Sequence, residues 1–230
     1  MDGRAAGLSL TPALPAIIAA MADLITLARL LLLIVVVIVA YQPYSYWHIV
    51  NVALLIVVFV SDGIDGYVAR KRNETSIFGA VFDIASDRMI EFAMWIVLVD
   101  LDIVPVWVPL VFIIRGTLVD AIRTSQVESG KVAPFAALKT PLGKWLVAGR
   151  FMRGFYAALK ATTFCWLLLI RPLPVLWPSV LEDWMGLLHA IGTALVYASV
   201  LTCLIRGVPV IWEFAYRERY SFAPRRTGSG

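Results

Sequence analysis

The sequence predicts an all-α polytopic membrane protein with six transmembrane helices in a single integral membrane domain that covers residues 1–230. Of the 230 residues, 60% are hydrophobic and 16% are charged, and the mean hydropathy is +0.83. Soluble domains usually have about 45–50% apolar and about 25% charged residues. In addition, long apolar runs recur, and about 20 apolar residues suffice to cross a hydrocarbon layer. This composition excludes an ordinary soluble globular protein.

Six apolar windows define the expected spans, which lie near residues 18–40, 47–70, 78–99, 105–124, 150–170 and 185–206. The first could be mistaken for a secretory signal, because AIIAAMA contains small residues. However, the apolar stretch continues through LARLLLLIVVVIVAY without a cleavage-like break. We therefore expect a membrane helix here as well.

Turn-forming sequences separate the six windows, in the order YQPYSYW, KRNETS, DLDIVP, a long segment around ESGKVAP, and RPLPVLWPS. All of them except KRNETS contain proline, which favours turns because it fixes one backbone angle and has no N–H donor. The short KRNETS connection predicts that the second and third helices are antiparallel neighbours. The chain ends in RRTGSG, and we expect a flexible tail at about residues 222–230.

The distribution of basic residues predicts the orientation in the membrane. Lysine and arginine are concentrated in the second and fourth connections and after the sixth window, whereas the opposite face has only Arg171. By the positive-inside rule, both termini are cytoplasmic. The net charge of +4 is then explained by attraction to anionic lipid headgroups, not to nucleic acid. We expect an integral protein of a prokaryotic plasma membrane whose functional site faces the cytoplasm.

Four aspartates lie where the second and third windows meet the water. Asp62 and Asp65 are three residues apart and Asp83 and Asp87 are four apart, so each pair shares one helical face. If all four meet at roughly 5 Å, with an effective dielectric constant of about 20, their mutual repulsion sums to about 10–20 kcal/mol. Protons or bound cations could relieve it. With oxygen ligands only, the cations would be Mg²⁺ or Mn²⁺, and the cluster could hold two.

Small residues around the aspartates would let a bulky ligand approach. Gly63, Gly66, Ala69 and Gly79 have little or no side chain, although close helix packing in a membrane explains such residues equally well. Arg70 could bind a phosphate oxygen, or could simply be a cytoplasmic flanking charge. Paired metals beside carboxylates and a phosphate-sized opening indicate phosphoryl transfer.

The stretches DGIDGYVAR and GAVFDIASD resemble the signature of the CDP-alcohol phosphatidyltransferases, D-x-x-D-G-x-x-A-R followed by G-x-x-x-D-x-x-x-D, at all eight fixed positions. The resemblance implies a membrane enzyme, typically homodimeric, that moves a phosphatidyl group from CDP-diacylglycerol to an alcohol and releases CMP. It also implies two bound metal ions. The roles that it implies are metal ligation by Asp62, Asp65 and Asp83, completion of the metal site and general-base catalysis by Asp87, and CDP binding by Gly66, Ala69, Arg70, Gly79 and Thr26.

The acceptor alcohol is less clearly indicated. DLITLAR, residues 23–29, resembles the N-x-x-T-x-x-R opening of the glycerol-phosphate and cardiolipin branches, with aspartate in place of asparagine. FDIASDR is nearer to the inositol-type enzymes. We expect glycerol 3-phosphate, with inositol phosphate, inositol or phosphatidylglycerol as alternatives. The candidate acceptor-binding residues are Arg115, Lys144, Arg150, Arg153 and Lys160, which could instead form a lipid-contacting charge cluster.

Two other classes of function compete with the enzyme. Intramembrane carboxylates also mark cation transporters, but no line of acidic residues continues across the predicted membrane. A non-catalytic scaffold related to the enzymes would be expected to lack at least one aspartate, and none is missing. Glu91 continues the stripe of Gly79, Asp83 and Asp87 by one turn. It could orient a basic acceptor contact, pair with Arg115 or sit hydrated in the site.

Overall fold

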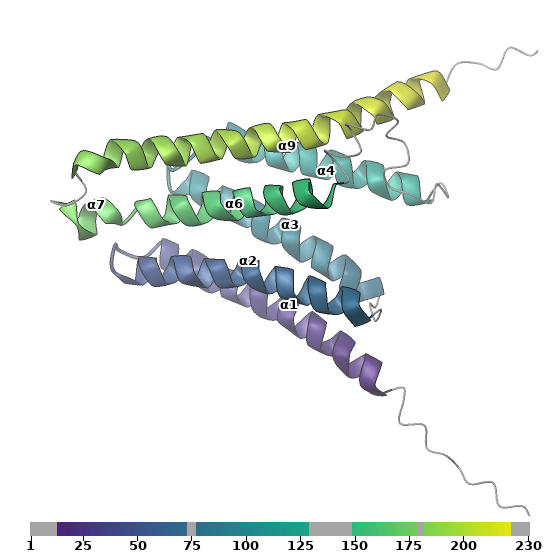
Figure 1. Cartoon of the computed structure of the whole chain (residues 1–230), viewed down its shortest axis with the longest axis horizontal. Coiled ribbons are helices and arrows are strands. Elements are labelled where there is room, and N and C mark those ends of the chain that lie inside the picture. Colours follow the sequence, from purple (N-terminus) through teal and green to yellow (C-terminus); the bar gives the residue numbers. More distant parts are fainter. Residues whose placement is uncertain (1–12, 73–76, 129–148, 179–181, 222–230) are drawn as a thin grey trace, which may run out of the picture. The chain divides into compact units, whose positions relative to one another are not determined.

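The computed structural model of the chain describes residues 13–72, 77–128, 149–178 and 182–221, and all regular secondary structure in these ranges is helical (Figure 1). Six helices have more than 20 residues: α1 (Ala13–Ala40), α2 (Trp47–Arg72), α3 (Ile77–Asp100), α4 (Trp107–Glu128), α6 (Arg150–Ile170) and α9 (Met185–Ser221). Two short elements, α7 (Leu173–Leu176) and the 3₁₀ helix η1 (Glu182–Trp184), precede α9. The prediction of an all-α chain with six long helices is confirmed.

Two of the described segments are long and apolar enough to cross a membrane, Phe151–Leu176 and Met185–Tyr216. Leu24–Ala40 and Trp47–Ser61 are apolar but shorter. Several ionisable residues interrupt the apolar sequence of α3 and α4. The helices themselves therefore agree with the predicted windows, while six membrane crossings remain a prediction.

The last helix extends 15 residues beyond the predicted end of the sixth window, to Ser221. Pro209 lies inside it and removes one backbone hydrogen bond. Side-chain packing between α9 and α4 offsets this loss. Val210 is buried with Val119 and Ile122 of α4, and the next turn of α9 adds Ile211 and Phe214 to this cluster.

The chain divides into two compact units, which are described separately. In the first, α1 packs along α2 and α3 contributes its residues up to Met94. Buried side chains at helical spacing form the α1–α2 core: Leu33 and Val36 on α1, and Val52, Leu55 and Val58 on α2. The side-chain amide of Asn51 also donates a buried hydrogen bond of 3.0 Å to the carbonyl of Val36.

Residues 171–178 belong to this first unit and close the end of α1. The guanidinium of Arg171 donates a hydrogen bond of 2.7 Å to the carbonyl of Ala40, the last residue of α1. It also lies over the ring of Tyr44, with 5.1 Å between its Cζ and the ring centroid. A cation at this position satisfies one of the terminal carbonyls that an α-helix leaves without an intrahelical partner.

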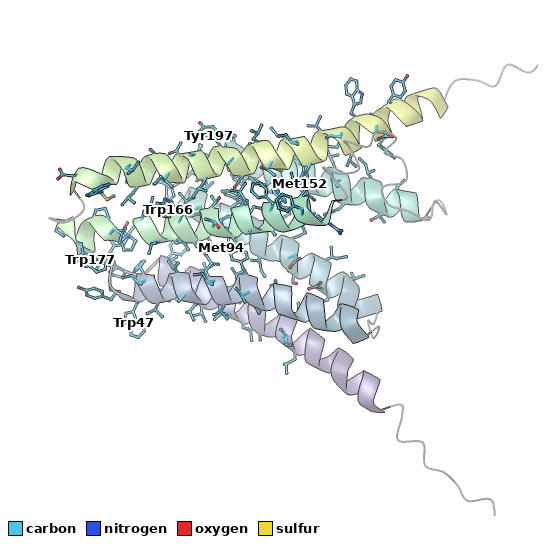
Figure 2. The ribbon with its side chains drawn as sticks, viewed as in Figure 1. Trp47, Met94, Met152, Trp166, Trp177 and Tyr197 are labelled. Atoms are coloured by element: carbon cyan, nitrogen blue, oxygen red, sulfur yellow. The ribbon has the colours of Figure 1, made fainter. Side chains whose placement is uncertain are left out.

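The second unit contains the end of α3 together with α4, α6 and α9. The fully buried Trp95 stacks on Phe112 of α4 and meets Phe164 of α6 edge to face, at centroid distances of 4.6 and 4.7 Å. Between α6 and α9, the buried hydroxyls of Thr163 and Ser199 are 2.9 Å apart. Nearby, the indole N–H of Trp166 donates to the carbonyl of Leu188 at 3.1 Å (Figure 2). These contacts fix the helices that carry the basic side chains discussed below.

Candidate functional site

Two aspartates of the signature lie side by side on α3. Asp83 and Asp87 are four residues apart, and their side chains are 47% and 48% exposed. One guanidinium from α1 serves both carboxylates. Nη2 of Arg29 donates to Oδ1 of Asp87 at 3.2 Å, and Nη1 of Arg29 lies 3.7 Å from Oδ1 of Asp83. The structure therefore brings Asp83 and Asp87 together, as the spacing predicts, and adds Arg29 to them.

The Arg29 side chain is only 4% exposed. A buried guanidinium is costly unless negative partners compensate for its lost hydration, and here two carboxylates do so. Thr26, three residues earlier, is also buried, so it lies on the same face of α1 as Arg29. Sequence reasoning had used Arg29 only to assign a branch of the family. The signal for a site role was a charged residue inside an otherwise apolar helix.

Glu91, one turn beyond Asp87, has its partner on its own helix. Nη1 of Arg88 is 3.1 Å from Oε2 of Glu91, and the two side chains are 27% and 7% exposed. The predicted stripe of acidic residues on α3 thus carries a cation within it. This pair fixes the side chain of Arg88, which directly follows Asp87 in the sequence.

Several predicted site residues lie in helices, but their side chains are outside the description. Asp62, Asp65, Gly66, Ala69 and Arg70 are in α2, Gly79 is in α3, and Arg150 begins α6. Lys144 lies outside the described residues altogether. The meeting of all four aspartates in one pocket therefore stays a prediction.

The donor set suits hard divalent cations. Carboxylate oxygens are the ligands that Mg²⁺ and Mn²⁺ prefer, and Asp83 and Asp87 present half-exposed carboxylates at adjacent turns. Among the residues with placed side chains, no group of three or more His, Cys, Asp or Glu comes together, and Asp62 and Asp65 are not among those residues.

A second group of charged side chains lies in the other unit, and we call it the cation cluster: Arg115 of α4, Lys160 of α6 and Arg206 of α9. All three surround the ring of the buried Tyr156. Nζ of Lys160 is 4.4 Å from the ring centroid, and the Cζ atoms of Arg206 and Arg115 are 5.3 and 5.9 Å away. The electron-rich face of an aromatic ring attracts cations and so helps to hold the three together.

Two features of the cation cluster favour an anionic ligand. The Nε atom of Arg115 is buried and has no hydrogen-bond partner among the described residues. Arg206 is 7% exposed although it carries a full positive charge. Guanidinium groups bind phosphate through paired, charge-assisted hydrogen bonds. Convergence of such donors from three helices is the arrangement that a phosphate-binding site requires.

The sequence predicted two of these three cations. Arg115 and Lys160 were candidates, whereas Arg206 had been assigned to the basic segment after the last span. It lies inside the apolar helix α9, between LTCLI and GVPVIW, and this was the signal for a site role. Arg153, another candidate, is exposed on α6. The stem of Arg115 packs against Gly207, where an added Cβ would overlap the Cγ atom of Arg115.

Comparison with known proteins places the chain in a family. Residues 19–205 match the CDP-alcohol phosphatidyltransferase family, and the chain belongs to it. The match includes all four aspartates, Arg29 and two of the three cations of the cation cluster.

Relatives named "CDP-diacylglycerol--glycerol-3-phosphate 3-phosphatidyltransferase" are found in several bacteria. The one from Bacillus subtilis (strain 168) is 34% identical over 85 residues, which cover 37% of this chain and 44% of the relative. The one from Wigglesworthia glossinidia brevipalpis is 30% identical over 110 residues, 44% of this chain and 60% of the relative. The one from Haemophilus influenzae (strain ATCC 51907 / DSM 11121 / KW20 / Rd) is 26% identical over 115 residues, 49% and 60% respectively. The chain thus spans about half the length of these relatives.

The Arg88–Glu91 pair gives a prediction about stability. Arg88→Ala should lower the free energy of unfolding by about 1–3 kcal/mol, because it removes a partner of a carboxylate that is 7% exposed. Arg88→Leu/Glu91→Leu should recover most of this loss, since it removes both charges. Thermal unfolding in detergent measures both variants. Equal destabilisation in the single and double variants would show that the pair is energetically unimportant.

Proposed function

We propose that the protein is a phospholipid-synthesising transferase that moves a phosphatidyl group from CDP-diacylglycerol to glycerol 3-phosphate and releases CMP. The observation that carries the proposal is the placement of Asp83 and Asp87, the last two aspartates of the family signature, as adjacent half-exposed carboxylates on α3. Family membership supports the reaction class. The printed names of the bacterial relatives support the acceptor.

In this proposal each signature residue has a specific task. Asp62, Asp65 and Asp83 hold two divalent cations, Mg²⁺ or Mn²⁺, and Asp87 completes their site. When bound, such ions offset the negative charge of the diphosphate and of its leaving group. The CDP moiety is bound by the residues that the signature and α1 supply: Gly66, Ala69, Arg70, Gly79 and Thr26.

Asp87 acts as the general base. A carboxylate oxygen of Asp87 accepts the proton of the acceptor hydroxyl while the hydroxyl oxygen forms a bond to the phosphorus of the phosphatidyl group. The bond from that phosphorus to the oxygen of CMP breaks, and CMP leaves with the electron pair. Arg29 keeps Asp87 in place through its 3.2 Å hydrogen bond to Oδ1.

The cation cluster favours a phosphorylated acceptor. We assign the phosphate of glycerol 3-phosphate to Arg115, Lys160 and Arg206. Inositol phosphate shares the group that these cations would bind, so it is the alternative that fits the cluster next best. Inositol itself has no phosphate, and phosphatidylglycerol carries its phosphate between two glycerols instead of at a free end, so the cluster is less suited to either.

The setting is a membrane. We propose that all six long helices cross a prokaryotic plasma membrane in a single integral domain, with both termini and the aspartates at the cytoplasmic face. The flanking basic residues of the sequence support this orientation. We further propose a homodimer in contact with membrane lipid, on the basis of the family resemblance.

An acceptor panel tests the proposed reaction. Purified protein with CDP-diacylglycerol and Mg²⁺ or Mn²⁺ should release CMP with glycerol 3-phosphate, and much more slowly with inositol phosphate, inositol or phosphatidylglycerol. Asp87→Asn should reduce kcat by about 10²- to 10⁴-fold, because the general base is lost. Asp183→Asn, at an exposed aspartate of η1, is the matched control and should keep wild-type activity. Absence of CMP with every alcohol, from folded protein, would refute the enzyme.

Variants of the cation cluster test the acceptor site. Arg206→Gln and Lys160→Gln should each raise the KM for glycerol 3-phosphate about 10- to 100-fold, because a charge-assisted hydrogen bond contributes about 1.5–3 kcal/mol. Gly207→Ala should raise it too, because the added Cβ displaces the stem of Arg115. The exposed Arg153 should be less sensitive to replacement by glutamine. An unchanged KM in Arg206→Gln and Lys160→Gln would remove the phosphate from this cluster.

A further inference from the structure

The guanidinium of Arg29 occupies an unusual position for a residue beside a metal site. It is almost completely buried, and its two Nη atoms approach carboxylates on two successive turns of α3. Both contacts are to Oδ1 atoms, at 3.2 Å for Asp87 and 3.7 Å for Asp83. The helix that carries Arg29 packs mainly along α2, so the long arginine side chain reaches α3 across the buried face of α1.

We propose that Arg29 is a permanent cation of the carboxylate site, which stays in place when divalent ions bind and makes their binding depend on the nucleotide. The inference rests on the proposed function, because it takes the four aspartates as the metal ligands. In this role Arg29 is a positioning residue. It acts on substrate only through Asp83, Asp87 and the ions.

Burial is the reason why Arg29 should stay. A guanidinium with 4% exposure has no route to water that avoids rearranging α1, and a displaced guanidinium would remain a buried charge without its carboxylates. Ions that bind Asp83 and Asp87 must therefore use the Oδ2 atoms or share Oδ1 with the guanidinium. In either case the positive charge of Arg29 remains close to the ions and repels them.

Charge counting gives the consequence for metal binding. The four aspartates carry four negative charges, and Arg29 reduces this to a net charge of −3. Two divalent ions would then bring the site to +1, which disfavours the second ion. The negatively charged diphosphate of a CDP group reverses this sign. The weaker of the two ions should therefore bind tightly only when the nucleotide is present, and the loss of Arg29 should remove this dependence.

Mn²⁺ binding to the full-length protein in detergent tests the inference, with electron paramagnetic resonance of free Mn²⁺ as the readout. In the wild type, saturating CDP should tighten the weaker Mn²⁺ site at least about tenfold. Arg29→Gln should bind Mn²⁺ at that site at least about tenfold more tightly than wild type without CDP, and should show little further effect of CDP. Arg29→Lys keeps the charge and should restore the wild-type dependence on CDP.

The control and the contrary results are specific. Arg171→Gln also removes an arginine charge from the first unit, but from the end of α1, and should leave Mn²⁺ binding unchanged. Arg29→Met provides a second uncharged variant if Arg29→Gln does not fold. Equal or weaker Mn²⁺ binding in the uncharged variants would overturn the inference, and so would a wild type in which CDP has no effect on Mn²⁺. If the wild type nevertheless releases CMP, the proposed function stands and only the role of Arg29 fails.

Discussion

Compensation of clustered negative charge is the constraint on which this structure depends. A membrane-type helix bundle offers little water to hydrate carboxylates, and four aspartates are concentrated at the junction of its second and third helices. In the described part of the site, a buried guanidinium lies between two of them. The helical spacing of four residues sets Asp83 above Asp87, and Arg29 on another helix holds this arrangement. Such a pair is prepared to take additional cations without a change of backbone.

The same physics operates with opposite sign in the second unit. There, three cations from three helices surround one tyrosine ring. The packed aromatic core of Trp95, Phe112 and Phe164 fixes the helices that carry two of them, α4 and α6. An acidic site that needs cations and a basic site that needs an anion are the two requirements of a reaction between a metal-bound diphosphate and a phosphorylated alcohol. Family membership supports the assignment of these two sites to one enzyme.

The sequence predicted the helices well because their signal is local. Each apolar run is bounded by proline or polar turns, so five of the six long helices end within a few residues of their predicted ends. The exception is α9, which continues through Pro209 because Val210, Ile211 and Phe214 pack with side chains of α4. A contact of this kind joins residues about 90 positions apart in the chain, and no pattern within the helix reveals it.

The candidate site shows the same division. The shared face of Asp83 and Asp87 follows from spacing alone, whereas the pairing of Arg29 with them joins residues 58 positions apart from Asp87 and depends on tertiary packing. Arg206 was missed for a related reason. A basic residue near the predicted end of a membrane span has an adequate explanation in membrane orientation, and only the approach of α4 and α6 shows that it joins Arg115 and Lys160.

The most direct measurement is an experimental structure of the protein with Mn²⁺ and CDP, in which anomalous scattering locates the manganese. The account predicts manganese bound to the carboxylates of Asp83 and Asp87, with the guanidinium of Arg29 still beside Asp87. Manganese bound elsewhere, or Arg29 turned away from both aspartates, would contradict it.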